Sequence, residues 1–82
     1  MKAAKLLAKA IQSPQNLRFA ELITLAEAFG YRLDRVSGSH HLLVHPSAER
    51  PLNIQNAKGK AKPYQVRQFL RDIEEFRLTL PS

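Results

Sequence analysis

The sequence has 82 residues and a net charge of +6. A chain of this length forms one small domain, with little room for a large substrate cavity. It contains no cysteine, which excludes disulfides and thiolate metal sites. No apolar run is long enough to span a membrane, and the composition fits the reducing cytoplasm, so we expect a cytoplasmic protein without membrane contact.

Two amphipathic helices are predicted at the start of the chain. Residues 2–12 carry apolar side chains at helical spacing, namely Leu6, Leu7, Ala10 and Ile11. Ser13-Pro14 ends this helix, because the residue before a proline avoids helical geometry. Residues 18–29 form the second helix, with the apolar stripe Leu22, Leu25, Ala26 and Phe29. Gly30 is its natural stop.

Three strands follow, because apolar and polar residues now alternate with the period of a strand. The strands are "YRLDRVS" (31–37), "HHLLVHP" (40–46) and "PLNIQN" (51–56). Their connections are too short for parallel crossovers, so the pairing is antiparallel. We interpret "AKGKAK" as a flexible basic loop.

Pro63 opens a last helix, with the apolar stripe Val66, Phe69, Leu70 and Ile73. The order of elements is then α-α-β-β-β-α. This order predicts an α+β fold, in which a three-stranded antiparallel sheet has helices on one face. The other face is free to meet a partner.

The excess positive charge lies in one part of the chain. Residues 31–71 contain eight basic and two acidic residues, whereas the rest of the chain contains five of each. This concentration favours a polyanionic partner. The alternative is an ordinary solvated basic surface.

The same segment contains all three histidines, in "SGSHHLLVHP" (37–46). His40 and His41 point to opposite faces of a regular strand, and His41 and His45 are ~13 Å apart along it. Zinc–nitrogen bonds are ~2 Å long, so this spacing gives no chelate, and we predict neither a metal site nor a cofactor. Ser37 and Ser39 lie near the histidines, but no acidic residue sits at a position that would orient an imidazole for a catalytic triad.

General acid–base catalysis of RNA cleavage requires fewer groups from the protein than a metal site or a catalytic triad does. RNA supplies its own nucleophile, the 2′-hydroxyl. The protein then needs an imidazole to move protons and cations to stabilise the charged transition state. The alternative is that His40 and His41 are merely polar strand residues.

The stretch "GSHHLLVHP" after "AFGYRLDRVS" resembles the HicA family, the small toxins of type II toxin–antitoxin modules. The tail "LNIQNAKGKAKPYQVRQFL" is similar to a subgroup whose last helix opens with "KPYQV". The resemblance covers roughly residues 18–75. It implies a single domain over residues 1–82, with a helical extension at 1–16 and an α-β-β-β-α core at 17–77.

The resemblance implies a fold like that of double-stranded-RNA-binding domains and the activity of a ribosome-independent mRNA interferase that requires no metal. It also implies a HicB antitoxin that covers the active site. Family members use one strand histidine after a Gly-Ser turn, which by position is His40. His41 is the second choice, and His45 is interpreted as structural.

RNA contacts are expected from the turn, the basic loop and the last helix, at Gly38, Ser39, Lys58, Lys60, Lys62, Arg67 and Arg71. Arg71 could instead pair with Glu75 one turn later, and Tyr64 suits either base stacking or packing. Many family members have another histidine where this chain has Gln55-Asn56, which favours a one-histidine mechanism or an attenuated enzyme. Two alternatives stay open: a non-catalytic module that binds duplex RNA, and a domain whose basic face binds an acidic protein.

Overall fold

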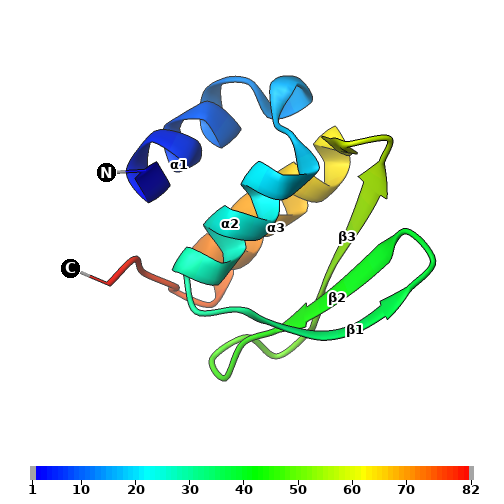
Figure 1. The fold of residues 1–82 in the computed structure, drawn as a ribbon. Coiled ribbons are helices and arrows are strands. Elements are labelled where there is room, and N and C mark those ends of the chain that lie inside the picture. Colours follow the sequence, from blue (N-terminus) through cyan, green and yellow to red (C-terminus); the bar gives the residue numbers. More distant parts are fainter. Residues whose placement is uncertain (1, 82) are drawn as a thin grey trace.

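The helices begin and end close to the positions that the sequence predicts. In the computed structural model, which describes residues 2–81, they are α1 (Lys2–Gln12), α2 (Phe19–Ala28) and α3 (Pro63–Glu75), with a short 3-10 turn, η1 (Pro14–Asn16), after α1 (Figure 1). Gly30 follows α2 with a φ of +102°, a conformation that side chains rarely adopt. A Cβ there would also lie 2.9 Å from His45 Nε2, so the position is suited to glycine.

The sheet has four strands rather than the predicted three. They are β1 (Arg32–Ser37), β2 (His40–Val44), β3 (Leu52–Ala57) and β4 (Lys60–Ala61), paired antiparallel in that order. The added strand β4 is short and lies within the segment predicted as a flexible loop. That prediction was wrong, because Lys58 and Gly59 make a tight two-residue turn instead.

Both residues of this turn have positive φ, 54° at Lys58 and 86° at Gly59, the signature of a type I′ hairpin turn. The Asn56 side-chain Oδ1 accepts a hydrogen bond of 2.7 Å from the Gly59 N–H. Glycine suits this geometry, whereas lysine is an unusual residue for it, so only one of the two turn residues matches the usual turn signal. The hairpin places Lys58, in the turn, and Lys60, directly after it, on one ordered edge.

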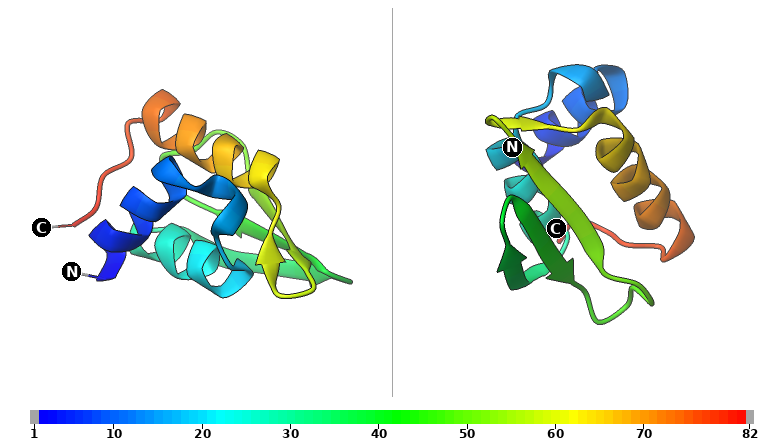
Figure 2. Two further views of the ribbon diagram at one scale, coloured as in Figure 1. Left: turned by 90° about the horizontal axis from the view of Figure 1, so that it is seen from above. Right: turned by 90° about the vertical axis from the view of Figure 1, so that its right-hand side faces the viewer.

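One face of the sheet packs against α2 and α3, and the core lies between these layers (Figure 2). Leu43 of β2 pairs in register with Leu52 of β3, and both are fully buried with Ile54. The predicted stripe of α2 is buried as well. Helix α1 packs mainly against α2 and α3, where it buries Leu6 and Ala10.

Strand β1 lies at the edge of the sheet and is exposed along its whole length. The β1–β2 hairpin extends away from the helices (Figure 1). Leu33 and Val36 consequently remain about half exposed, although the alternating pattern suggested a half-buried strand. Ile11 at the end of α1 is likewise exposed rather than part of the predicted apolar stripe.

The predicted fold class is confirmed. From α2 to α3 the chain has the α-β-β-β-α order of double-stranded-RNA-binding domains, with the short β4 added before the last helix. Within residues 2–81, no helix is long and apolar enough to cross a bilayer.

Tyr31, just before β1, carries a buried hydroxyl that has no hydrogen-bond partner among the described residues. Burial, together with the negative charge of Asp72, raises the pKa of Tyr31 to about 12 from the ordinary 10.0. The folded state therefore favours the neutral phenol. This ionisation therefore leaves stability unaffected well below pH 10 and lowers it as the pH rises toward 12, because only the unfolded chain ionises readily there.

We predict that Tyr31→Phe raises the free energy of unfolding by about 1 kcal/mol at neutral pH, since it removes an unsatisfied buried group and keeps the ring. Urea denaturation followed by circular dichroism measures this change. The variant should also lose less stability between pH 10 and pH 12 than the wild type does. Tyr64→Phe, at an exposed tyrosine, serves as the control. A destabilised Tyr31→Phe would mean that the hydroxyl has a stabilising partner.

Candidate active site and nucleic-acid interface

His40 lies on the open face of the sheet, at the start of β2, and is exposed. Its Nδ1 is 3.2 Å from the side-chain Oδ1 of Asn53 on the neighbouring strand β3. Because an amide oxygen can only accept, the neutral ring donates from Nδ1 and leaves Nε2 as a free acceptor. Nε2 makes no hydrogen bond to the described residues. The geometry therefore presents a proton acceptor to the open face.

His41 points to the opposite face, toward the helices. It pairs in register with the buried Ile54, and its ring lies 4.7 Å from the ring of Phe19 at the start of α2. Its Nδ1 is 3.2 Å from the backbone carbonyl of Ser39. These contacts and the half-buried position of His41 show that its side chain is packed against the helices. The two adjacent histidines thus have different environments.

His45 connects the end of α2 to the loop after β2. Its Nε2–H donates to the carbonyl of Phe29 at 2.8 Å, and its Nδ1 accepts the N–H of Ser47 at 2.9 Å. The ring also packs edge-on against Tyr31, with centroids 5.1 Å apart. Both nitrogens are therefore occupied by structural contacts.

The Gly38-Ser39 turn precedes His40. Gly38 has a φ of +59°, and a Cβ there would meet open space, so this part of the hairpin tip is uncrowded. The Ser39 carbonyl accepts a hydrogen bond from the Asn56 N–H at 2.9 Å, and Nδ1 of His41 also lies within hydrogen-bond distance of it. The turn is thus tied to the end of β3, which places His40 close to that strand.

Two of the predicted cations, Lys58 and Lys60, line a groove of about 360 Å³. Lys9 of α1 and Arg18 before α2 complete its positive wall. Lys9 is neutralised by Glu21 at 2.9 Å, and this bond lowers the pKa of Glu21. The other three cations are in no ion pair within residues 2–81. Lys9 and Arg18 were not predicted as part of the interface, because only the folded chain brings them beside the β3–β4 turn.

A second groove of about 340 Å³ lies between β3 and α3. It contains Arg71, one of the predicted cations, and it adjoins the histidine because Asn53 lines it. Its other lining residues are Arg50, Pro51, Leu52, Tyr64, Gln65 and Gln68. Lys62 and Arg67 line neither groove. The structure therefore divides the predicted phosphate contacts among different places instead of gathering them around His40.

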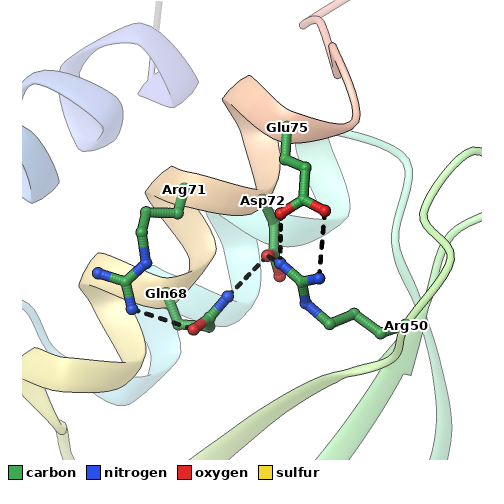
Figure 3. Close-up of polar contacts among 5 residues, drawn as sticks. All are labelled: Arg50, Gln68, Arg71, Asp72 and Glu75. Atoms are coloured by element: carbon green, nitrogen blue, oxygen red, sulfur yellow. Dashed lines mark hydrogen bonds and ion pairs between the residues drawn. The ribbon is translucent and has the colours of Figure 1, made fainter.

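Arg50, in the loop before β3, is bound by two carboxylates of α3 (Figure 3). Its Nη2 lies 2.6 Å from Asp72 Oδ1 and 2.7 Å from Glu75 Oε1. The pairing raises the pKa of Arg50 and lowers that of Glu75. Arg50 also lies over the ring of Phe76, 5.0 Å from its centroid. This cation is therefore structural and ties the β2–β3 loop to α3.

The alternative pairing of Arg71 with Glu75 does not form. Arg71 instead donates from Nη2 to Gln68 Oε1 at 3.0 Å, while Glu75 is held by both guanidinium nitrogens of Arg50 (Figure 3). A two-pronged arginine–carboxylate contact is stronger than a single exposed pair one turn apart. Arg71 thus keeps its positive charge without a carboxylate partner within the described residues.

Comparison with known families agrees with the resemblance seen in the sequence. The family model described as "HicA toxin of bacterial toxin-antitoxin" matches residues 19–74. The chain belongs to the HicA toxin family. This HicA protein is accordingly the toxin of a toxin–antitoxin module, and its partner is an antitoxin. Neither a search of curated proteins nor a search of solved structures found a match.

The family match begins at the first residue of α2 and ends within the last turn of α3. Helix α1 and η1 therefore precede the matched segment. Together they supply Lys9, Gln15 and Asn16 to the first groove. In this HicA protein the groove is built partly from residues outside the family's matched region.

We predict that the neutral imidazoles of His40 and His45 are opposite tautomers. Long-range proton–nitrogen NMR spectra at a pH of about 8.5, where an ordinary imidazole is neutral, should show Nδ1–H for His40 and Nε2–H for His45. Asn53→Ala should shift His40 toward the Nε2–H form and leave His45 unchanged. An unchanged His40 spectrum in this variant would contradict the Asn53 contact.

Proposed function

We propose that this HicA protein is a metal-independent endoribonuclease that cleaves mRNA, with His40 as its general acid and base. The observation that carries the proposal is the exposed Nε2 of His40 on the open sheet face, with Nδ1 held by Asn53. The family membership supports it, because a toxin needs a damaging activity. The concentrated positive charge supports an RNA substrate.

The proton transfers of the reaction need only groups that RNA and one imidazole provide. Nε2 of His40 accepts the proton of a ribose 2′-hydroxyl as the 2′-oxygen attacks the adjacent phosphorus. The bond from phosphorus to the 5′-oxygen of the next nucleotide breaks. The imidazolium then returns its proton to that leaving oxygen. The products are a 2′,3′-cyclic phosphate and a 5′-hydroxyl, and the histidine regains its starting state.

Asn53 has a positioning role in this scheme. The transient imidazolium keeps the Nδ1–H bond to the Asn53 oxygen, so the same contact orients the ring before and after proton transfer. Gln55 lies in register with His40 on β3, and the family resemblance implies that many relatives have a second histidine where this chain has Gln55-Asn56. The single ring therefore both removes and returns the proton.

The cations hold the RNA backbone. Lys58, Lys60 and Arg18 line the first groove, carry no ion pair within residues 2–81 and are available for phosphate contacts. Such contacts fix the strand but give little sequence information. We further propose that a HicB-like antitoxin blocks this protein in the cytoplasm by covering the open face that carries His40.

We predict that His40→Ala lowers RNA cleavage by ~10²-fold or more, because the general acid–base group is lost. His41→Ala is the matched control: it removes the adjacent imidazole and should keep most of the activity. Both variants and the wild type are incubated with a long mRNA in EDTA, and fragments are resolved on denaturing gels. Circular dichroism verifies that the variants are folded.

Three outcomes would contradict the assignment. Equal cleavage by the wild type and His40→Ala would remove the catalytic role of His40. Loss of activity in His41→Ala alone would move that role to the inward-facing ring. Binding of duplex RNA without cleavage by any form would favour a non-catalytic module instead.

A further inference from the structure

The groove between β3 and α3 differs from the basic groove in its chemistry. One of its lining residues, Asn53, also holds the His40 ring, so the groove adjoins the proposed catalytic group. The basic groove on the other side has no residue in common with that contact. An RNA segment next to a phosphate at His40 would therefore lie beside the second groove.

The groove exists because the middle of β3 has an open edge. β4 pairs only with Asn56 and Ala57 at the end of β3. Before that, the edge faces α3, which runs beside it (Figure 2). The buried Gln65 of α3 accepts the Gln55 N–H at 2.7 Å. Since alternate residues direct their backbone groups to the same edge, the N–H and C=O of Asn53 also face this groove.

Tyr64 forms an aromatic wall at the start of α3. It is 57% exposed, and its hydroxyl accepts a hydrogen bond from Gln65 Nε2 at 3.4 Å. Lys62 lies near the ring, with Nζ 6.0 Å from its centroid. An exposed aromatic ring held at its hydroxyl is a suitable platform on which an RNA base stacks.

The polar side chains of this groove are held in place. Gln68 donates from Nε2 to Asp72 Oδ1 at 2.8 Å and accepts from Arg71 at its own Oε1 (Figure 3). Asp72 is buried and forms an ion pair with Arg50, so the hydrogen bonds from Asp72 through Gln68 to Arg71 begin at a side chain with a fixed position. Arg71 uses one N–H in this way and retains other donors. Fixed donors next to a flat ring suit the edge of a base, whereas exposed lysines suit a phosphate.

We propose that this groove binds a nucleobase next to the cleaved phosphate and thereby selects the cleavage site. Tyr64 stacks on the base, Gln68 fixes the arginine, and the remaining donors of Arg71 bind the base edge. Guanine is the favoured base, because its O6 and N7 are both acceptors that match a guanidinium. The inference rests on the proposed RNA substrate, although its test does not depend on cleavage.

The experiment uses the His40→Ala protein, which holds RNA components without cutting them. Guanosine, adenosine, cytidine and uridine 3′-monophosphates are each titrated while proton–nitrogen NMR spectra are recorded. We expect the guanosine nucleotide to bind at least ~5-fold more tightly than the pyrimidine nucleotides. The largest shifts should fall on Tyr64, Gln68 and the Asn53 amide.

Variants then assign the contacts in the same background. Tyr64→Ala should weaken guanosine nucleotide binding by ~10-fold, whereas Tyr64→Phe should retain most of it because the ring remains. Arg71→Ala should remove the preference for guanine. Lys5→Ala, an exposed cation of α1 that lines neither groove, is the charge-matched control. Thermal melting verifies that each variant is folded.

Equal affinity for all four nucleotides, with shifts confined to Lys58 and Lys60, would overturn the inference. So would guanosine binding that Tyr64→Ala leaves unchanged. Neither result would affect the role of His40, which the cleavage assay tests separately. Conversely, if the wild type does not cleave RNA but binds guanosine nucleotide selectively, the nuclease proposal would be wrong. The proposal that the groove between β3 and α3 binds guanine would stand.

Discussion

Burial of one sheet face against α2 and α3 determines how the side chains of β2 and β3 are oriented. Leu43, Leu52 and Ile54 face the helices and are fully buried, and this fixes the register of β2 against β3. A shift by one residue would exchange the two faces of a strand. His41 is therefore held inward beside Phe19, and His40 is held outward beside Asn53. The chemical difference between two neighbouring histidines follows from the packing of leucines and an isoleucine.

Helix α3 is joined to the sheet by polar contacts as well as by its apolar stripe. Gln65 satisfies an open-edge backbone group of β3, and Asp72 holds Arg50 from the loop before that strand. Buried polar groups cost stability unless they are bonded, so these contacts specify one position for the helix. That position leaves a groove beside β3 with Tyr64 at one end. The same contacts that fix the fold thus shape the surface next to His40.

The charges serve two separate purposes. Arg50 and Lys9 are paired with carboxylates and hold elements together. Lys58, Lys60 and Arg71 have no carboxylate partner within residues 2–81 and stay available to an anion. The tight turn at Lys58-Gly59 makes one set of cations part of an ordered edge, and the Gln68 contact does the same for Arg71. A polyanion would therefore meet fixed positive groups on two sides of β3.

The order of the three helices and of β1 to β3, the helix boundaries within a few residues, the segregation of charge and the family could all be predicted from the sequence. These features depend on local periodicity, on the positions of proline and glycine and on a short Gly-Ser-His motif. All of these are patterns among residues that are close in the sequence. Only the tertiary structure decided which histidine is exposed, that Arg50 rather than Arg71 binds Glu75, and that Lys9 and Arg18 join the β3–β4 turn. Each of these depends on contacts between residues far apart in the chain. Strand β4 escaped prediction for a local reason, because the turn that joins it to β3 has a lysine at a positive-φ position where asparagine, aspartate or glycine is usual.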